Sequence, residues 1–212
     1  MPDTEASPLP STEAAPTVRK RPKPGERRIQ ILQTLASMLE QPGAERVTTA
    51  ALAAKLDVSE AALYRHFASK AQMFEGLIEF IEQSVLGLIN QIAEREAAGV
   101  VQAGKVVAML LQFGEKNPGM TRVMVGDALV FEHERLQVRM NQFFDKIESS
   151  LKQALRTAAQ EAGSATPTVD AQVRASALTA FAVGRLQRYA RSGFKRAPSE
   201  HLDASLHLLL KN

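Results

Sequence analysis

The residues best suited to chemistry in this 212-residue chain lie in the segment VSEAALYRHFASK, at positions 58–70. Two alanines are followed there by a phenol, a guanidinium and an imidazole within about two helical turns. On a helical wheel with about 100° per residue, Ala61 and Arg65 point outward, and a second alanine lies beside them. Tyr64 and His66 project from opposite flanks. The expected surface is a ridge of small residues between two hydrogen-bonding side chains.

A ridge of this shape fits the major groove of DNA, which is about 12 Å wide and admits a helix. Alanines let the backbone come close to the base edges, and the flanking side chains can reach phosphates on both walls. Leu63 and Phe67 on the opposite face are expected to pack on Leu52 and Leu56 of the preceding helix. The alternative is a helical corner that only packs, with its polar residues on an ordinary surface.

Two further features favour a phosphate-binding surface. Lys70 lies in the first turn of a long helix, where a cation is disfavoured unless an anion binds beside it. Thr48 or Thr49 caps the start of the second helix and is placed for a second phosphate contact.

The segment TVRKRPKPGERR, residues 17–28, has six basic residues against one glutamate. It is either a nucleic-acid arm or a solvated linker that keeps the chain soluble.

Composition excludes several classes of protein. Hydrophobic residues make up 45% of the chain, enough for a sizeable core, and there is no cysteine for a disulfide, a thiolate nucleophile or a Cys-based zinc site. No apolar run is long enough to span a bilayer, and the N-terminus lacks a signal peptide, so a cytoplasmic protein is expected. The four histidines lack metal-ligand spacing, and no phosphate loop or nucleophile motif appears. We expect no enzyme activity and no cofactor.

The organisation of the chain is helical throughout. Residues 1–23 are rich in Pro, Ser and Thr and are expected to be a disordered tail with the basic arm. Residues 24–70 are expected to form a three-helix DNA-binding domain of the helix-turn-helix type, and residues 71–212 a C-terminal helical domain. Strand-like alternation is absent, which predicts an all-α fold of about nine helices. Helices are predicted between Gly25 and Pro42, after Thr48 or Thr49, from Ser59 to near Phe67, from Ser69 with Gln72 as a capping box, and over 100–116, 119–130, 133–161, 169–193 and 199–210.

The segment VTTAALAAKLDVSEAALYRHFASKAQMF is similar to the DNA-binding region of TetR-family regulators. The resemblance implies that the third helix enters the major groove, that Tyr64, His66 and Lys70 hold phosphates, and that the start of the helix approaches the bases. Asp57 departs from the glycine that many members have in the turn, but aspartate tolerates the left-handed conformation better than most residues. The predicted DNA-binding residues are Thr48, Thr49, Ser59, Glu60, Ala61, Ala62, Tyr64, Arg65, His66 and Lys70.

A second candidate surface lies on the fourth helix. Phe80 is about 100° or more off the main apolar stripe, and Gly76, Ser84 and Gly87 share its side of the helix. A large aromatic residue among small ones makes a shallow groove with an anchor, which is typical of a partner-binding site. The alternative is that another helix of the same domain covers Phe80.

Three more segments, GLIEFIEQSV, QFGEKNPGMTRV and DALVFEHERLQVRMNQFFDKIE, resemble the TetR-family nucleoid occlusion factors of gammaproteobacteria. The resemblance implies a homodimer, or a dimer of dimers, on palindromic nucleoid DNA. It also implies that a groove between the fourth and fifth helices grips the C-terminal tail of FtsZ, the tubulin-like division GTPase, and inhibits Z-ring assembly. Leu88 and Gln112 depart from the Arg and Gly of the family pattern. The implied FtsZ-binding residues are Phe80, Leu88, Met109, Gln112, Lys116 and Asn117.

The last two predicted helices contain RASALTAFAVGRLQRYARSGF and LDASLHLLLK, in which small and large apolar residues alternate at helical spacing. By the family resemblance they form a four-helix bundle with a partner subunit; alternatively they complete the core of the monomer.

Two rival functions stay open. One is a transcriptional repressor that a small ligand releases from its operator, and the other is an architectural nucleoid protein with no division partner.

Overall fold

The computed structural model describes residues 25–41 and 46–211, and every regular element in these ranges is helical. The predicted all-α fold is therefore confirmed. The predicted tail, residues 1–23, and the first four basic residues of the arm lie outside the described residues. The elements are α1 (Glu26–Leu39), α2 (Thr49–Lys55), α3 (Glu60–Tyr64), α4 (Lys70–Arg95), α5 (Gly99–Lys116), α6 (Pro118–Met124), the 3-10 helix η1 (Asp127–Leu129), α7 (Glu134–Glu161), α8 (Pro167–Arg191) and α9 (Leu202–Leu210).

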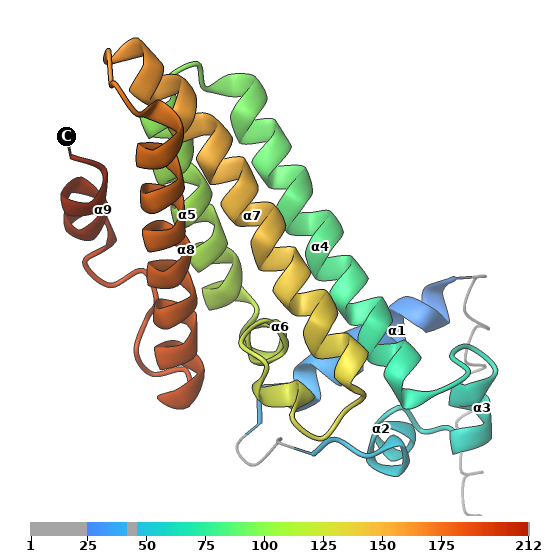
Figure 1. The fold of residues 1–212 in the computed structure, drawn as a ribbon. Helices are drawn as coiled ribbons and strands as arrows, with labels where there is room; N and C mark the ends of the chain where they lie inside the picture. Colours follow the sequence, from blue (N-terminus) through green and yellow to red (C-terminus); the bar gives the residue numbers. More distant parts are fainter. Residues whose placement is uncertain (1–24, 42–45, 212) are drawn as a thin grey trace, which may run out of the picture.

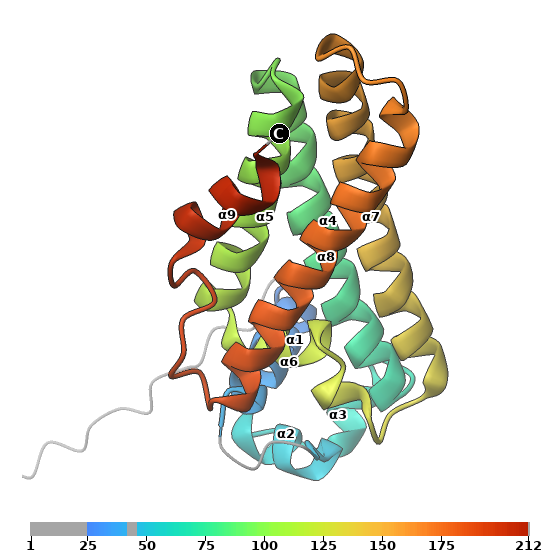
Figure 2. The ribbon, with the colours of Figure 1, turned by 60° about the vertical axis from the view of Figure 1, so that its left-hand side comes forward.

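The four long helices α4, α5, α7 and α8 lie alongside one another as a bundle (Figure 1). The short helices α1, α2 and α3 form a cluster at one end of this bundle, with α6 beside α1. Turning the molecule shows α9 on the outside of the bundle, where it packs on α5 and α8 (Figure 2). The helix-turn-helix elements thus occupy one end of the molecule.

One continuous hydrophobic cluster runs from the helix-turn-helix cluster into the bundle. Ile31 and Leu35 of α1 and Met73, Phe74 and Leu77 from the start of α4 belong to this cluster and are almost completely buried. The first two turns of α4 therefore pack as part of the helix-turn-helix cluster. The predicted domain boundary between residues 70 and 71 does not coincide with a gap in the hydrophobic core, and it stays a prediction.

The joint between α1 and α6 depends on a close approach of backbone. A Cβ atom added to Gly119 would lie 2.0 Å from the carbonyl oxygen of Ala36, so no side chain fits at this position. Directly beyond it, the buried Thr121 hydroxyl donates to the carbonyl oxygen of Gly114 at 2.8 Å and so holds α6 against α5. Helices α1 and α6 therefore pack with their backbones in direct contact at Gly119.

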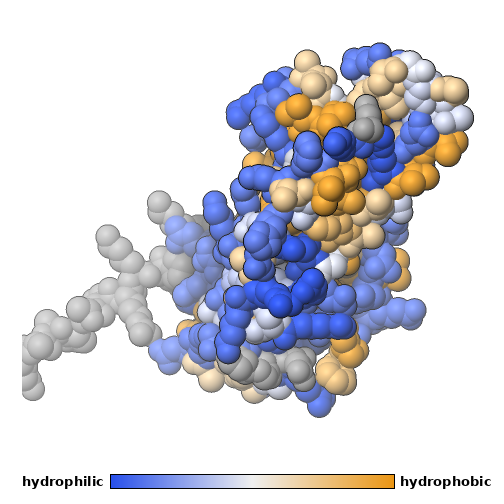
Figure 3. Space-filling view, turned by 90° about the vertical axis from the view of Figure 1, so that its left-hand side faces the viewer, coloured by the Kyte–Doolittle hydropathy of each residue, from blue (hydrophilic) through white to orange (hydrophobic). Residues whose placement is uncertain are grey.

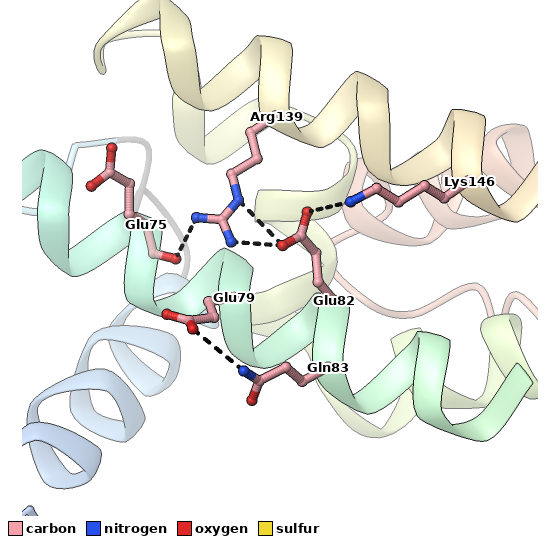
Figure 4. Close-up of polar contacts among 6 residues, drawn as sticks. All are labelled: Glu75, Glu79, Glu82, Gln83, Arg139 and Lys146. Carbon is pink, nitrogen blue, oxygen red and sulfur yellow. Dashed lines mark hydrogen bonds and ion pairs between the residues drawn. The ribbon is translucent and has the colours of Figure 1, made fainter. Parts of the chain in front are cut away.

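Helices α4 and α7 are joined by a partly buried polar cluster (Figure 4). Arg139 donates from Nη2 and Nε to the same carboxylate oxygen of Glu82, at 2.6 and 3.2 Å, and from Nη1 to the carbonyl oxygen of Glu75 at 3.4 Å. Lys146 lies 3.8 Å from the other oxygen of Glu82. Burial lowers the screening of such a network by solvent, so these contacts favour one register of α7 on α4.

Several predicted features differ from those observed, apart from the end of α3 described below. The helix expected over 119–130 is divided, because Gly126 adopts a left-handed φ of 85° and a 3-10 turn follows. The last helix begins at Leu202 instead of 199, after His201 with a φ of 53°. Ser69 does cap α4 by accepting from Gln72 N at 3.2 Å, but the Gln72 side chain accepts from Ala68 N and not from Ser69, so the capping box is only half formed.

Candidate nucleic-acid interface and partner groove

Caps and a buried face position the third helix. Ser59 accepts from Ala62 N at 3.3 Å and so begins α3, while Asp57 takes the left-handed conformation, with a φ of 55°, in the turn before it. Leu63 and Phe67 are both 1% exposed and anchor the segment, as predicted. At the start of α2 the cap is Thr48, which accepts from Ala51 N at 3.1 Å.

The opposite face of α3 is open to solvent. Ala61 and Arg65 are exposed, and so is Tyr64, at 44%. Ala62 is half-buried behind them. The short helix therefore presents the small-residue ridge with a phenol beside it that the sequence predicts. Whether this surface contacts bases and phosphates stays a prediction.

His66 does not lie on the helix. Because α3 ends at Tyr64, His66 follows in the turn, where its backbone N–H donates to the carbonyl oxygen of Leu63 at 2.9 Å. Its side chain is half-buried. The predicted helix is thus shorter than expected at this end, and the phosphate contact of His66 stays a prediction.

Two of the predicted DNA-binding residues contact each other. The Thr49 hydroxyl donates to a carboxylate oxygen of Glu60 at 2.5 Å and so ties the first turn of α2 to the first turn of α3. A carboxylate repels phosphate, so we interpret Glu60 as a residue that fixes the angle between the two helices. Thr48 and Ser59 are exposed at the two helix starts.

Lys70 has a partner that the sequence does not reveal. Its ammonium forms an ion pair with Glu132, in the segment between η1 and α7, and also lies 5.7 Å from the centre of the Phe74 ring. The Lys70 side chain is 27% exposed, whereas that of Glu132 is only 9% exposed. A phosphate at this helix start must therefore compete with Glu132 for Lys70.

Arg28 has a structural role that sequence reasoning missed. It was counted in the basic arm, but its guanidinium carbon lies 4.1 Å above the Phe67 ring and its Nη1 donates to the carbonyl oxygen of His66. Arg28 of α1 thus holds the turn that ends α3. No sequence signal distinguishes it from the other basic residues beside it, because both partners lie about forty residues later.

The α4 side of the predicted groove is exposed. Phe80 is 49% exposed and Leu88 is 38% exposed, so the alternative that another helix of the chain covers Phe80 does not hold. A Cβ atom at Gly76 would lie 3.2 Å from the Phe67 ring and 3.3 Å from Leu32, so Gly76 belongs to the joint with α1 and α3 and not to the groove. Gly87 has nothing within 4 Å and leaves space beside the two apolar residues.

The α5 side carries the remaining predicted groove residues. Gln112 and Lys116 are exposed, and Met109 and Asn117 are half-buried. Asn117 ends α5 and donates from Nδ2 to the carbonyl oxygen of Phe113 at 2.7 Å, which fixes its side chain. Helices α4 and α5 contact each other, so the two sets of residues lie on neighbouring helices, and a common groove between them stays a prediction.

Helix α8 has two apolar faces. Leu178, Ala182 and Leu186 are buried, so one face of α8 belongs to the core of the monomer, as one of the two alternatives expected. A second stripe at helical spacing is open to solvent, and α9 adds Leu208, which is 77% exposed. Figure 3 shows the hydrophobic patch on this side of the molecule. The exposed stripe consists of Val169, Val173, Ala177 and Ala180, with Gly184 at its end.

Two families of known proteins match the chain. Residues 31–77 match the bacterial regulatory proteins of the tetR family, and residues 98–212 match the SlmA-like C-terminal domain of tetracyclin repressor-like proteins. The structure is similar to the fatty acid degradation regulator FadR from Bacillus halodurans, with a TM-score of 0.71 and 14% identity over 89% of this chain and 96% of that one. FadR from Bacillus subtilis, solved with stearoyl-CoA, gives a TM-score of 0.70 at 13% identity over 86% of this chain and 97% of that one. The fold and its helix-turn-helix define a TetR-type regulator.

Relatives from several bacteria are much more similar in sequence. The nucleoid occlusion factor SlmA of Idiomarina loihiensis is 50% identical over 183 residues, which cover 86% of this chain and 93% of that protein. The SlmA of Photobacterium profundum is 50% identical over 188 residues, covering 88% of this chain and 95% of that protein. The chain belongs to the SlmA family. Its membership in this TetR-type family confirms the prediction of a DNA-binding regulator that is not an enzyme.

No helix within residues 25–41 and 46–211 is long and apolar enough to cross a membrane.

Proposed function

We propose that this protein is a nucleoid occlusion factor. As a homodimer on palindromic chromosomal sites, it contacts FtsZ and inhibits Z-ring assembly over the nucleoid, where it is located. The observation that carries this proposal is the 50% identity, over 86% of the chain, to a relative of that name. The identity extends over both the helix-turn-helix and the seam between α4 and α5.

In this proposal α3 reads the major groove. The exposed Ala61 ridge permits a close approach to the base edges, and Tyr64 and Lys70 bind phosphates on either side. Tyr64→Ala and Lys70→Ala are expected to weaken binding to all sequences and to flatten its salt dependence. Ala61→Glu is expected to abolish specific binding while the protein stays folded. Normal operator binding by all three variants would exclude α3 as the reading element.

FtsZ is proposed to bind along the seam between α4 and α5. Phe80 and Leu88 are apolar anchors of the kind that dominate binding energies at protein interfaces. Lys116, in the last turn of α5, provides a cation for an acidic tail or a terminal carboxylate. The groove residues therefore combine apolar area with one charge, which suits a short peptide.

A fluorescent peptide with the sequence of the FtsZ tail tests this site. Phe80→Ala is expected to weaken binding about 30-fold, the effect of losing a hot spot of about 2 kcal/mol. Phe131→Ala is the matched control, because Phe131 is 66% exposed and lies outside α4 and α5. If the peptide fails to bind the wild type both with and without DNA, the proposed partner is wrong.

The homodimer is proposed to form through α8 and α9. Their exposed stripe would be buried against the same stripe of a second subunit, since a two-fold interface uses one patch twice. Small residues in the stripe permit close approach of the helices, and Val169, Val173 and Leu208 supply apolar area. A symmetric dimer in turn requires a two-fold symmetric DNA site.

A ligand-released repressor is the second candidate, and one observation favours it. A cavity of about 420 Å³ lies between the distal parts of α4, α5 and α7, lined by apolar residues and by neutral polar ones such as Asn90, Gln102 and Ser150. Such a volume accommodates a small molecule. Selection of bound fragments from genomic DNA separates the candidates: many palindromes away from promoters support nucleoid occlusion, whereas a single site beside an operon supports the repressor.

A further inference from the structure

The C-terminal end of α8 and the turn after it form a concentrated basic surface. Residues 185–196 have the sequence RLQRYARSGFKR, with five basic residues and no acidic one. The formal net charge of the whole chain is only +3. The positive charge of this short segment therefore exceeds the net charge of the whole chain. None of its basic residues has a role in the function proposed above.

Four of the five cations face solvent. Arg188, Arg191, Lys195 and Arg196 are exposed, and within the part of the chain that the structure describes none of them forms an ion pair. Arg185 differs, because its guanidinium donates to the carbonyl oxygens of Pro198 and Glu200 and so holds the segment before α9. We call the four exposed residues the α8 basic patch.

The turn that presents the end of this patch is well fixed. The Ser192 hydroxyl oxygen accepts from Lys195 N at 3.1 Å and from Arg196 N at 2.9 Å. Gly193 and Phe194 both adopt left-handed φ values, of 62° and 63°. The Phe194 ring packs edge-on against Tyr189, with 5.1 Å between centroids. Because these contacts order the backbone, little conformational entropy is lost when an anion binds there.

The helix dipole accounts for only part of this arrangement. Cations in the last turn of a helix are stabilised by the free carbonyl groups, which is a sufficient reason for Arg188 and Arg191. Lys195 and Arg196 lie beyond the end of α8, and the dipole effect falls off within the last turn. The dipole therefore does not account for these two cations, whereas a polyanionic partner would.

The position of the patch favours DNA as that partner. The C-terminal end of α8 lies toward the end of the molecule that carries α1, α2 and α3 (Figures 1 and 2). The most hydrophilic side chains gather below the hydrophobic patch on this side of the molecule (Figure 3). DNA bound by α3 brings a row of phosphates to this end, with one charge per about 1.7 Å of duplex.

The chemistry of the patch also fits phosphate better than protein. Protein interfaces depend on buried apolar anchors, yet residues 185–196 include none of the large hydrophobic residues that are exposed. Three of the four cations are arginines, whose planar guanidinium groups bind phosphate in a bidentate manner. We propose that the α8 basic patch is a second DNA contact, made to the phosphodiester backbone without sequence preference.

The test compares two double variants on a duplex of random sequence of about 30 base pairs. Arg191→Gln with Arg196→Gln removes two charges from the patch, and Arg95→Gln with Arg156→Gln removes two exposed charges from the distal ends of α4 and α7. Each lost phosphate contact lowers the slope of log affinity against log salt by about 0.9. Between about 50 and 200 mM salt, the affinity of the wild type should then fall about 12-fold more than that of the patch variant, counted per subunit.

The control variant should keep the wild-type slope, and both variants should keep the wild-type urea midpoint. Two results overturn the proposal: an unchanged slope for the patch variant, or an equal change for the control, which would reduce the effect to net charge. Unchanged DNA binding together with lost binding to phosphatidylglycerol vesicles or to an acidic peptide would assign the patch to a membrane or a protein instead. Because the duplex has no operator, the test is independent of how α3 reads sequence and of FtsZ.

Discussion

Replacing Glu132 with glutamine is expected to tighten DNA binding. Glu132 and a phosphate compete for the charge of Lys70, so the ion pair is expected to oppose the bound state. With 27% of the Lys70 side chain exposed, the pair is partly screened, and pairs of this kind contribute about 0.2–1 kcal/mol. Removing the pair should therefore lower the dissociation constant by about 1.4- to 5-fold per subunit.

Fluorescence anisotropy with a labelled operator duplex measures this change. Glu134→Gln is the matched control, because it makes the same substitution two residues later at an exposed position. In the Lys70→Ala background, Glu132→Gln should have little effect, since the pair is already lost. Weaker DNA binding by Glu132→Gln would show that Glu132 orients Lys70 toward the phosphate, and an equal gain from Glu134→Gln would reduce the effect to general repulsion.

Three further outcomes are expected. Gly119→Ala should lower the free energy of unfolding, measured in urea, by about 1–3 kcal/mol, because the new Cβ atom would overlap the backbone of α1. The control Gly87→Ala, where nothing lies within 4 Å, should raise the free energy of unfolding by about 0.5–1 kcal/mol. Equal effects of the two substitutions would contradict the close packing of α1 on α6. The hydroxyl groups that donate to the Asp170 carboxylate lower its pKa below the ordinary value of 3.8. The ionised carboxylate therefore stabilises the fold above that pH, and this stabilisation is lost as the pH falls. The urea midpoint of the wild type should exceed that of Asp170→Asn at neutral pH and equal it in acid, and a difference that persists in acid would refute this explanation. Val173→Asp should produce a monomer in sedimentation, while Ser149→Asp on α7 should not; dimers of both variants would exclude the α8 stripe as the interface.

Local features of the fold were predictable from the sequence. Ser59 and Ser69 cap their helices as predicted, because an N-cap depends only on a side chain and an N–H three residues later. For α2 the sequence left Thr48 and Thr49 open, and the structure identifies Thr48. The exposure of Phe80 was left open, because the helical period places it off the apolar stripe but does not show whether another helix covers it. The caps, by contrast, are decided within a few residues of the chain.

Features that depend on distant partners were not predictable. Lys70 pairs with a residue 62 positions later, and no pattern near Lys70 indicates Glu132. Gly76 was grouped with Phe80 by the wheel, although its close neighbours belong to α1 and to the turn after α3. The end of α3 was also not predictable: the helix ends at Tyr64, about one turn earlier than the periodicity suggests, so His66 lies in the turn that follows.

Helix α4 connects the helix-turn-helix cluster with the candidate partner-binding surface. Its first turns belong to the core that seats α3, and the same 26-residue rod carries Phe80 and Leu88 farther along. A helix of this length measures about 39 Å, so a tilt of about 5° about one end moves the other by about 3 Å. If the peptide and the duplex bind as proposed, a peptide on the middle of α4 can therefore change how α3 contacts DNA, and bound DNA can in turn change the orientation of the surface that the peptide contacts.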